Sequence, residues 1–236
     1  MLKFLLILVY YDRPNIVKNA LNTIAALQSD NWELAIIDDG SPRPIQPIAE
    51  EILKDHISKV KFYQTGDTLE QKIQRGGIFG QYINKAMDDS NADLVMIVCD
   101  DDAVVPDALI NLSNWFEANP NAMYCYSHVI PYDPTRQTAG PHLPRLPHGT
   151  NHFGPINPVC QVDASQVVFR KICHDSGNVN YPYPSTCNLD AHTFGQLFAN
   201  YGLAPFSGLI VQYKGWFPAQ LGNRRASPQD MYNTRD

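Results

Sequence analysis

Short apolar runs alternate with stretches of helical periodicity through the first half of the chain. Apolar runs of this length are typical of strands buried on both faces of a sheet. Between them, apolar residues recur every three or four positions, which is typical of amphipathic helices. This alternation predicts an α/β fold with a mostly parallel, twisted sheet and helices on both faces. The expected strands are residues 1–11, 34–37, 60–63 and 94–98, and the expected helices are residues 16–27, 48–57, 79–88 and 106–118.

The pattern changes at about residue 124. A strand expected at 124–128 runs into a segment, 131–158, whose seven prolines exclude regular structure. Beyond it, the pattern predicts a strand, a helix that ends at a glycine, a last strand and a polar, mobile tail. We therefore expect a single domain over 1–236 with two halves, 1–123 and 124–236. The later elements are expected at residues 162–171, 189–201 and 209–213, with the tail from about 222.

Charge and cysteine content narrow the class of protein. The net charge of −6 argues against nucleic acid as a partner. Five cysteines without paired spacing favour free thiols in a reducing compartment over disulfides or a zinc site. The apolar N-terminus lacks a small-residue cleavage site and is too short to span a bilayer. We expect a soluble, cytoplasmic protein without a transmembrane segment.

Acidic residues follow two of the expected strands. The run Asp38-Asp39-Gly40-Ser41 follows one, and Asp100-Asp101-Asp102 follows the other. Open α/β sheets bind ligands beyond the carboxyl ends of their strands. Three adjacent carboxylates in a partly dry site repel one another, so a hard divalent cation is the simplest stabilising partner. The alternative, a helix N-cap and a solvated turn, accounts for one or two of the acids but not for three.

Together the two acidic strand ends suit a nucleotide. One can bind a cation, while the other accepts hydrogen bonds from a base or a ribose. A nucleotide whose diphosphate is bridged by the metal fits both ends.

Three segments resemble the nucleotide-binding half of family 2 glycosyltransferases, which have the GT-A fold. The resemblance covers residues 4–118 in order and spacing. It implies that Asp39 binds a uracil ring, that Val9 to Tyr11 border the base, and that the Asp triplet is a DXD element. That element holds the ribose and the Mn²⁺ or Mg²⁺ of a UDP-sugar. The segments are Ile7-Leu8-Val9-Tyr10-Tyr11-Asp12-Arg13-Pro14, Ile36-Ile37-Asp38-Asp39-Gly40-Ser41, and Ala92-Asp93-Leu94 through Asp102 to Pro106-Asp107.

The resemblance also implies inversion at the anomeric carbon, with a carboxylate base from the second half. Asp190 opens the expected helix at 189–201, much as the catalytic acid does in the family's xED motif, although Leu189 stands where the family has Glu. The alternative is that Asp190 caps that helix or stabilises its dipole. Asp163 and Asp175 are the other candidates.

The family's Gly-x-x-x-Ala-Arg-Asn segment corresponds to residues 76–81 here, without its arginine. Arg75 or Lys72 is expected to contact the diphosphate instead. The complete expected site has Asp190 as catalytic base and two sets of ligands. The nucleotide-binding residues are Val9, Tyr11, Arg13, Asp39, Arg75, Asp100 and Asp101, and the metal ligands are Asp101 and Asp102.

The expected function is metal-dependent transfer of a sugar from a nucleotide donor, most simply a UDP-sugar, to a glycan or other hydroxyl acceptor. Residues 1–123 would bind the donor and 124–236 the acceptor. A sugar nucleotidyltransferase is a rival, but residues 11–14 are not the glycine-rich, basic phosphate loop that it needs. A catalytically inactive glycan- or nucleotide-binding protein is the other rival, which Leu189 leaves open.

Overall fold

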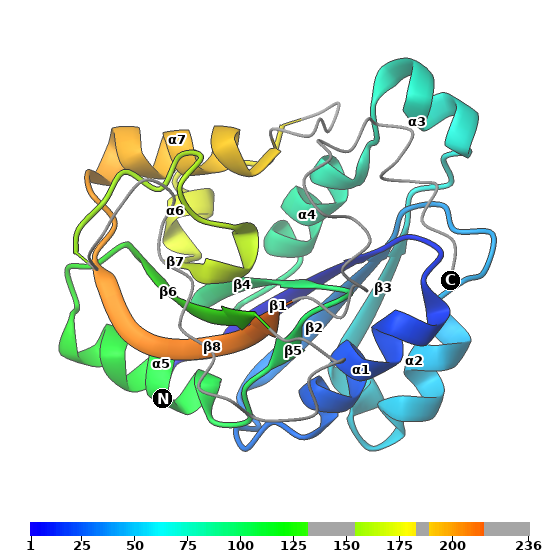
Figure 1. The fold of residues 1–236 in the computed structure, drawn as a ribbon, viewed down its shortest axis with the longest axis horizontal. Helices are drawn as coiled ribbons and strands as arrows, with labels where there is room; N and C mark the ends of the chain where they lie inside the picture. The colour runs from blue at the N-terminus through cyan, green and yellow to red at the C-terminus, as the bar shows by residue number, and fades with distance from the viewer. Residues whose placement is uncertain (132–153, 183–188, 215–236) are drawn as a thin grey trace.

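The computed structural model describes residues 1–131, 154–182 and 189–214 (Figure 1). These residues form one eight-stranded sheet with helices on both faces, which confirms the predicted fold class. The strands are β1 (Phe4–Tyr10), β2 (Trp32–Asp38), β3 (Val60–Gln64), β4 (Leu94–Cys99), β5 (Ala103–Val104), β6 (Tyr124–Pro131), β7 (Val167–Arg170) and β8 (Phe206–Lys214).

The sheet has the strand order β3-β2-β1-β4-β7-β6-β8-β5. Strands β3, β2, β1 and β4 are parallel to one another, whereas β7 runs antiparallel to both β4 and β6. Beyond β6, strand β8 is parallel to it, and β5 is antiparallel to β8. Strands from 1–123 and from 124–236 therefore share one sheet. The division of donor and acceptor binding between those ranges stays a prediction.

Helices cover the two faces of the sheet because successive side chains of a strand point to opposite sides. In β1, Phe4, Leu6 and Leu8 pack with the helices α1, α2 and α5. Leu5 and Ile7 pack on the other face with α4, α6 and α7 (Figure 1). The helices are α1 (Pro14–Ala25), α2 (Gln46–Ile52), α3 (Leu69–Arg75), α4 (Phe79–Asp88), α5 (Ala108–Ala118), α6 (Ile172–Asp175) and α7 (Leu189–Tyr201).

Several elements differ from the prediction. The helix expected to reach residue 57 ends at Ile52, and a 3₁₀ helix, η1 (Lys54–Lys59), follows it. The strand expected from residue 162 begins only at Val167, after the 3₁₀ helix η2 (Ala164–Gln166). Helices α3 and α6 and the short strand β5 were not expected. The prolines of 132–153 and the tail from 222 lie outside the described residues.

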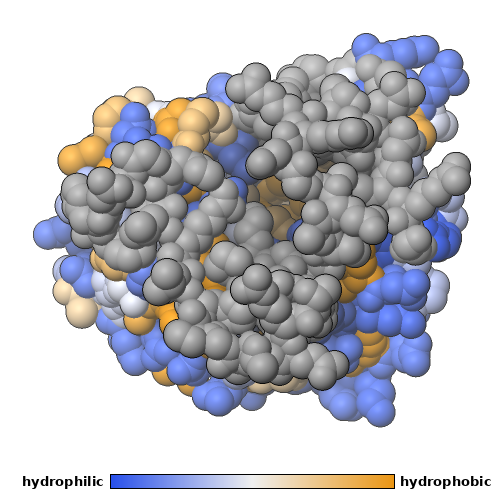
Figure 2. Space-filling model, viewed as in Figure 1, coloured by the Kyte–Doolittle hydropathy of each residue, from blue (hydrophilic) through white to orange (hydrophobic). Residues whose placement is uncertain are grey.

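Helix α3 has no apolar period to reveal it, but it has a capping box. The Thr68 hydroxyl accepts a hydrogen bond from the Gln71 backbone, and the Gln71 side chain accepts one from the Thr68 backbone. Figure 2 shows mainly hydrophilic residues at the upper right, where α3 lies. The spacing of Thr68 and Gln71 was therefore the one feature of the sequence that could have predicted this helix, because its apolar residues show no helical period.

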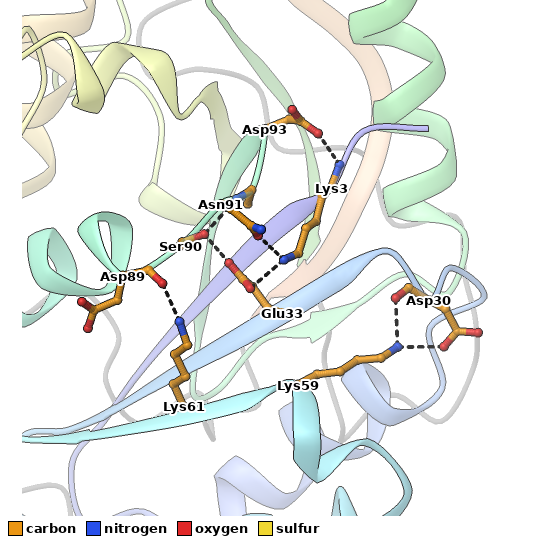
Figure 3. A network of polar contacts seen from close by, with 10 residues as sticks. Lys3, Asp30, Glu33, Lys59, Lys61, Asp89, Ser90, Asn91 and Asp93 are labelled. Carbon is orange, nitrogen blue, oxygen red and sulfur yellow. Dashed lines mark hydrogen bonds and ion pairs between the residues drawn. The ribbon is translucent and has the colours of Figure 1, made fainter.

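A polar network lies at the amino-terminal ends of the central strands (Figure 3). Lys3 forms an ion pair with Glu33 at 2.8 Å, and its backbone N–H donates to Asp93 at 2.8 Å. Lys59 forms a second ion pair with Asp30 at 2.8 Å. These contacts balance charge at the edge of the sheet opposite the acidic strand ends.

Candidate active site

The carboxyl ends of β2, β1 and β4 lie side by side. Tyr10 is in register with Asp38, and Val9 is in register with both Ile37 and Cys99. The acidic runs that follow β2 and β4 therefore emerge on the two sides of β1, at one edge of the sheet. This is the arrangement that parallel strands predict for a ligand site.

Beside β1, Asp39 belongs to a buried ion pair. The residue is 2% exposed, and its Oδ2 lies 3.0 Å from the Nζ of Lys72, whose side chain is 0% exposed. The Thr65 hydroxyl donates a hydrogen bond to the other carboxylate oxygen of Asp39 at 3.2 Å. Lys72 Nζ also lies 3.8 Å from the centroid of the Tyr11 ring, within the range of a cation–π contact.

Burial dominates the electrostatics of this cluster. Desolvation raises the pKa of Asp39, and the adjacent Lys72 opposes that rise. Desolvation likewise lowers the pKa of Lys72, and Asp39 opposes that fall. From the sequence, Lys72 was expected only as an alternative to Arg75 for contacting the diphosphate. In the structure it contacts Asp39 and Tyr11, the residues expected at the base.

Asp38 shapes the loop that presents Asp39. Its carboxylate accepts hydrogen bonds from the backbone N–H of Ser41 at 2.8 Å and of Ile45 at 3.1 Å. Gly40, just before Ser41, has φ +69°, and a Cβ at this position would lie 2.0 Å from the Asp67 carbonyl oxygen. The Asp-Asp-Gly-Ser run therefore needs its glycine for both conformation and space.

We expect Gly40→Ala to destabilise the fold more than Gly66→Ala. Both glycines have positive φ, but a Cβ at Gly66 would meet nothing within 4 Å. Gly66→Ala should therefore cost only the conformational penalty of about 1–2 kcal/mol. The clash at Gly40 should add about 1–3 kcal/mol, the usual cost of overpacking. Urea unfolding of both variants measures the difference, and equal losses would contradict the close approach to Asp67.

On the other side of β1, Asp100 pairs with Arg13. The Arg13 guanidinium lies 2.7 Å from Asp100 Oδ1, and the Asp100 side chain is 3% exposed. Desolvation raises the pKa of Asp100 to about 7, although Arg13 opposes the rise; Asp101 and Asp102 add to it. Arg13 is at the N-cap position of α1, shortly after β1. Its ion pair therefore fixes Asp100, which directly follows β4, beside the end of β1.

The rest of the triplet forms a candidate metal centre with Cys99. One ligand atom each from Cys99, Asp101 and Asp102 lies within 4.8 Å of the other two. Asp102 is fully buried, and the other two are half-buried. Two carboxylates that converge in this way suit Mn²⁺ or Mg²⁺, which prefer oxygen ligands. The sequence named Asp101 and Asp102 for this site but not Cys99.

Asp190 lies in the first turn of α7 and is half-buried. Burial raises the pKa of the Tyr181 hydroxyl, and the charges of Asp190 and Cys99 raise it further. Tyr181 is held against α4, since Asn84 accepts a hydrogen bond from its N–H at 2.8 Å and donates one to its carbonyl at 2.9 Å. One buried tyrosine therefore lies within electrostatic reach of both Asp190 and the metal centre.

The two rival acids have local structural roles. Asp163 forms a capping box with Gln166 at the start of η2. Asp175 forms an ion pair with Lys171 four residues earlier.

Among the remaining expected residues, Val9 is half-buried at the end of β1, and Arg75 is the last residue of α3. The side chain of Arg75 lies outside the described part of the structure.

Residues 5–177 match the family described as glycosyl transferase family 2. The chain belongs to this family. The match includes both acidic strand ends and residues 5–10 of β1 between them, and it ends before Asp190.

Individual relatives of this family 2 chain are distant. Protein CgeD of Bacillus subtilis is 23% identical over 125 residues, which are 53% of this chain and 29% of CgeD. S. aureus TarS 1–349 in complex with UDP-GlcNAc has a TM-score of 0.72 at 15% identity, over 98% of this chain and 63% of that one. The mannosyltransferase PcManGT of Pyrobaculum calidifontis, in complex with GDP-Man and Mn²⁺, has a TM-score of 0.63 at 16% identity, over 90% and 56% of the two chains.

At these identities the solved structures share the fold with this chain. The chain spans less than a third of CgeD and about six tenths of the TarS chain. Within residues 1–131, 154–182 and 189–214, no helix has the length and apolar character needed to cross a membrane.

Proposed function

We propose that the protein is a metal-dependent glycosyltransferase that moves a sugar from a UDP-sugar to a hydroxyl acceptor with inversion. The observation that carries this proposal is the pair of sites on the two sides of β1. Asp39 offers a hydrogen-bond acceptor for a base, and Asp101 and Asp102 offer oxygen ligands for a cation. Family membership and the nucleotide-sugars bound by the two structural neighbours support it.

The base would be bound by Asp39 and Lys72 together. A carboxylate accepts the imide N–H of uracil, and an ammonium 3.0 Å away can donate to a neighbouring carbonyl of the ring. Cytosine presents a ring-nitrogen lone pair where uracil presents its N–H, so it would face the carboxylate with the wrong polarity. This chemistry favours UDP over CDP.

The diphosphate would lie at the metal centre. Asp101 and Asp102 would hold Mn²⁺ or Mg²⁺, and Asp100 would contact the ribose from its position against Arg13. When bound, the cation neutralises the charge that develops on the departing diphosphate. Arg75, the last residue of α3, would supply further positive charge.

The acceptor would be activated by Asp190. Its carboxylate would take the proton of the acceptor hydroxyl as that oxygen bonds to the anomeric carbon, and the bond from this carbon to the diphosphate oxygen would break. Attack opposite the leaving group inverts the configuration. Residues 124–236 would supply the acceptor side.

We expect UDP with Mn²⁺ to raise the melting temperature of the protein. At about a hundred times its Kd, a ligand that binds only the native state stabilises it by about 2.7 kcal/mol. Because the diphosphate would bind through the cation, EDTA should remove most of this gain. CDP with Mn²⁺ should stabilise less than UDP does. A thermal-shift series with UDP, CDP, GDP and dTDP, each with Mn²⁺, Mg²⁺ or EDTA, measures all of these effects.

The EDTA arm of this series and two activity assays separate the proposal from its rivals. Equal stabilisation by UDP in EDTA would contradict the metal role of Asp101 and Asp102. A nucleotidyltransferase would instead consume UTP and release pyrophosphate. An inactive binding protein would bind UDP-sugar but transfer no sugar to any hydroxyl acceptor in a glycan screen.

A further inference from the structure

Cys99 is the last residue of β4 and immediately precedes the Asp triplet. Side chains alternate along a strand, so Cys99 lies on the same face as Val95 and Ile97, which pack toward α4 and α7. Its sulfur and carboxylate oxygens of Asp101 and Asp102 lie within 4.8 Å of one another. An element of the main sheet thus aims a sulfur atom at the two residues proposed to hold the cation.

We propose that Cys99 is a sulfur ligand of the divalent cation held by Asp101 and Asp102. This inference rests on the metal centre of the proposed function and adds a residue to it. In zinc sites the metal–sulfur distance is about 2.3 Å and the metal–oxygen distance about 2.2 Å, so two donor atoms on one cation lie at most roughly 4.5 Å apart. The donor atoms of Cys99, Asp101 and Asp102 lie within 4.8 Å of one another, so small side-chain movements would bring all three to one cation.

The donor set determines which cations the site prefers. Two carboxylates alone select hard cations such as Mg²⁺ and Mn²⁺, whereas a thiolate ligand favours softer ones. When the sulfur binds, its proton leaves to solvent. With Cys99 as a ligand, the site should therefore bind Co²⁺ and Cd²⁺ more tightly, relative to Mg²⁺, than an all-oxygen site would.

The test is a titration of the metal-free, full-length chain with Co²⁺ alone, followed by absorption spectroscopy. Thiolate coordination of Co²⁺ gives an intense near-ultraviolet charge-transfer band that oxygen ligands do not give. We expect this band in the wild-type protein and its loss in Cys99→Ser. The ratio of Cd²⁺ to Mg²⁺ affinity should fall by at least roughly tenfold in that variant, since even a lost outer-shell partner costs about 10–100-fold in metal affinity.

Cys160→Ser is the matched control because Cys160 is an exposed thiol outside the cluster; this variant should keep the band. Asp102→Asn should weaken Co²⁺ binding and the band together. A wild-type measurement needs no variant: Co²⁺ should slow alkylation of Cys99 by iodoacetamide, as peptide mass spectrometry would show, and leave Cys160 unaffected.

Co²⁺ binding without the band, or a band that survives in Cys99→Ser, would overturn the inference and leave the proposed function standing. Failure of Co²⁺ to bind the wild-type protein would overturn it as well. Failure of the proposed function has a separate signature, which is the absence of stabilisation by any nucleoside diphosphate with Mn²⁺ or Mg²⁺.

Discussion

Replacing Asp190 by Asn should lower kcat by roughly 10²–10⁴-fold, the usual contribution of a positioned general base. The affinity for the UDP-sugar should stay almost unchanged, because a base acts mainly in the transition state. Asp190 suits this role because it lies in the first turn of α7, where the resemblance to family 2 glycosyltransferases places the base. Single-turnover transfer to an acceptor found in a glycan screen, with UDP-sugar affinity and melting temperature on the same variant, measures the effect.

Capping and catalysis predict different results for this variant. Asn caps helices about as well as Asp, so a capping role would leave Asp190→Asn close to silent in both stability and rate. Asp175→Asn is the matched control, since Asp175 is an exposed carboxylate of α6 whose partner is the buried Lys171. It should leave transfer unchanged. Near-normal transfer by Asp190→Asn would exclude Asp190 as the base and favour Asp163, the remaining acid of that region.

The elements predicted correctly are those whose burial shows in the sequence. Residues of β1 and β4 are buried on both faces, so their sequences are continuous apolar runs that indicate strands directly. Helix α7 has the predicted bounds because apolar residues repeat along it and Gly202 ends it with φ +78°. Helix α3 escaped prediction because only its capping box, and no apolar face, indicates a helix.

Some features of the candidate site could likewise be predicted from the sequence, and others could not. Parallel strands bring their carboxyl ends to one edge, so the sequence could predict that the acids after β2 and β4 lie near each other. It could not predict which side chain would meet Asp39. Lys72 reaches it from α3, 33 positions further along the chain, and nothing in the local pattern links the two. Cys99 was not predicted as part of the site for another reason. A single cysteine at the end of an apolar run cannot be distinguished from a buried strand residue in the sequence, and only the structure shows its sulfur near Asp101 and Asp102.

Asp39→Ala should have two separable effects, because Asp39 is both the expected base contact and the partner of a buried ammonium. Removing one member of a buried ion pair costs about 3–5 kcal/mol, since Lys72 would be left buried without its counter-charge. Losing hydrogen bonds to the uracil ring should weaken UDP binding by about 1.5–3 kcal/mol. Urea unfolding measures the first effect, and calorimetric titration with UDP and Mn²⁺, at a temperature where the variant is folded, measures the second.

Asp39→Asn combined with Lys72→Met separates the two roles. It removes both charges at once, so it should recover much of the stability that Asp39→Ala loses, yet UDP should still bind weakly. Glu33→Ala is the matched control: Glu33 pairs with Lys3 at the opposite edge of the sheet (Figure 3), where both side chains are partly exposed. This partly exposed pair should contribute less to stability than the fully buried pair of Asp39 and Lys72, and UDP affinity should not change. Normal UDP affinity in either Asp39 variant would mean that the buried pair with Lys72 is structural and that the base binds elsewhere.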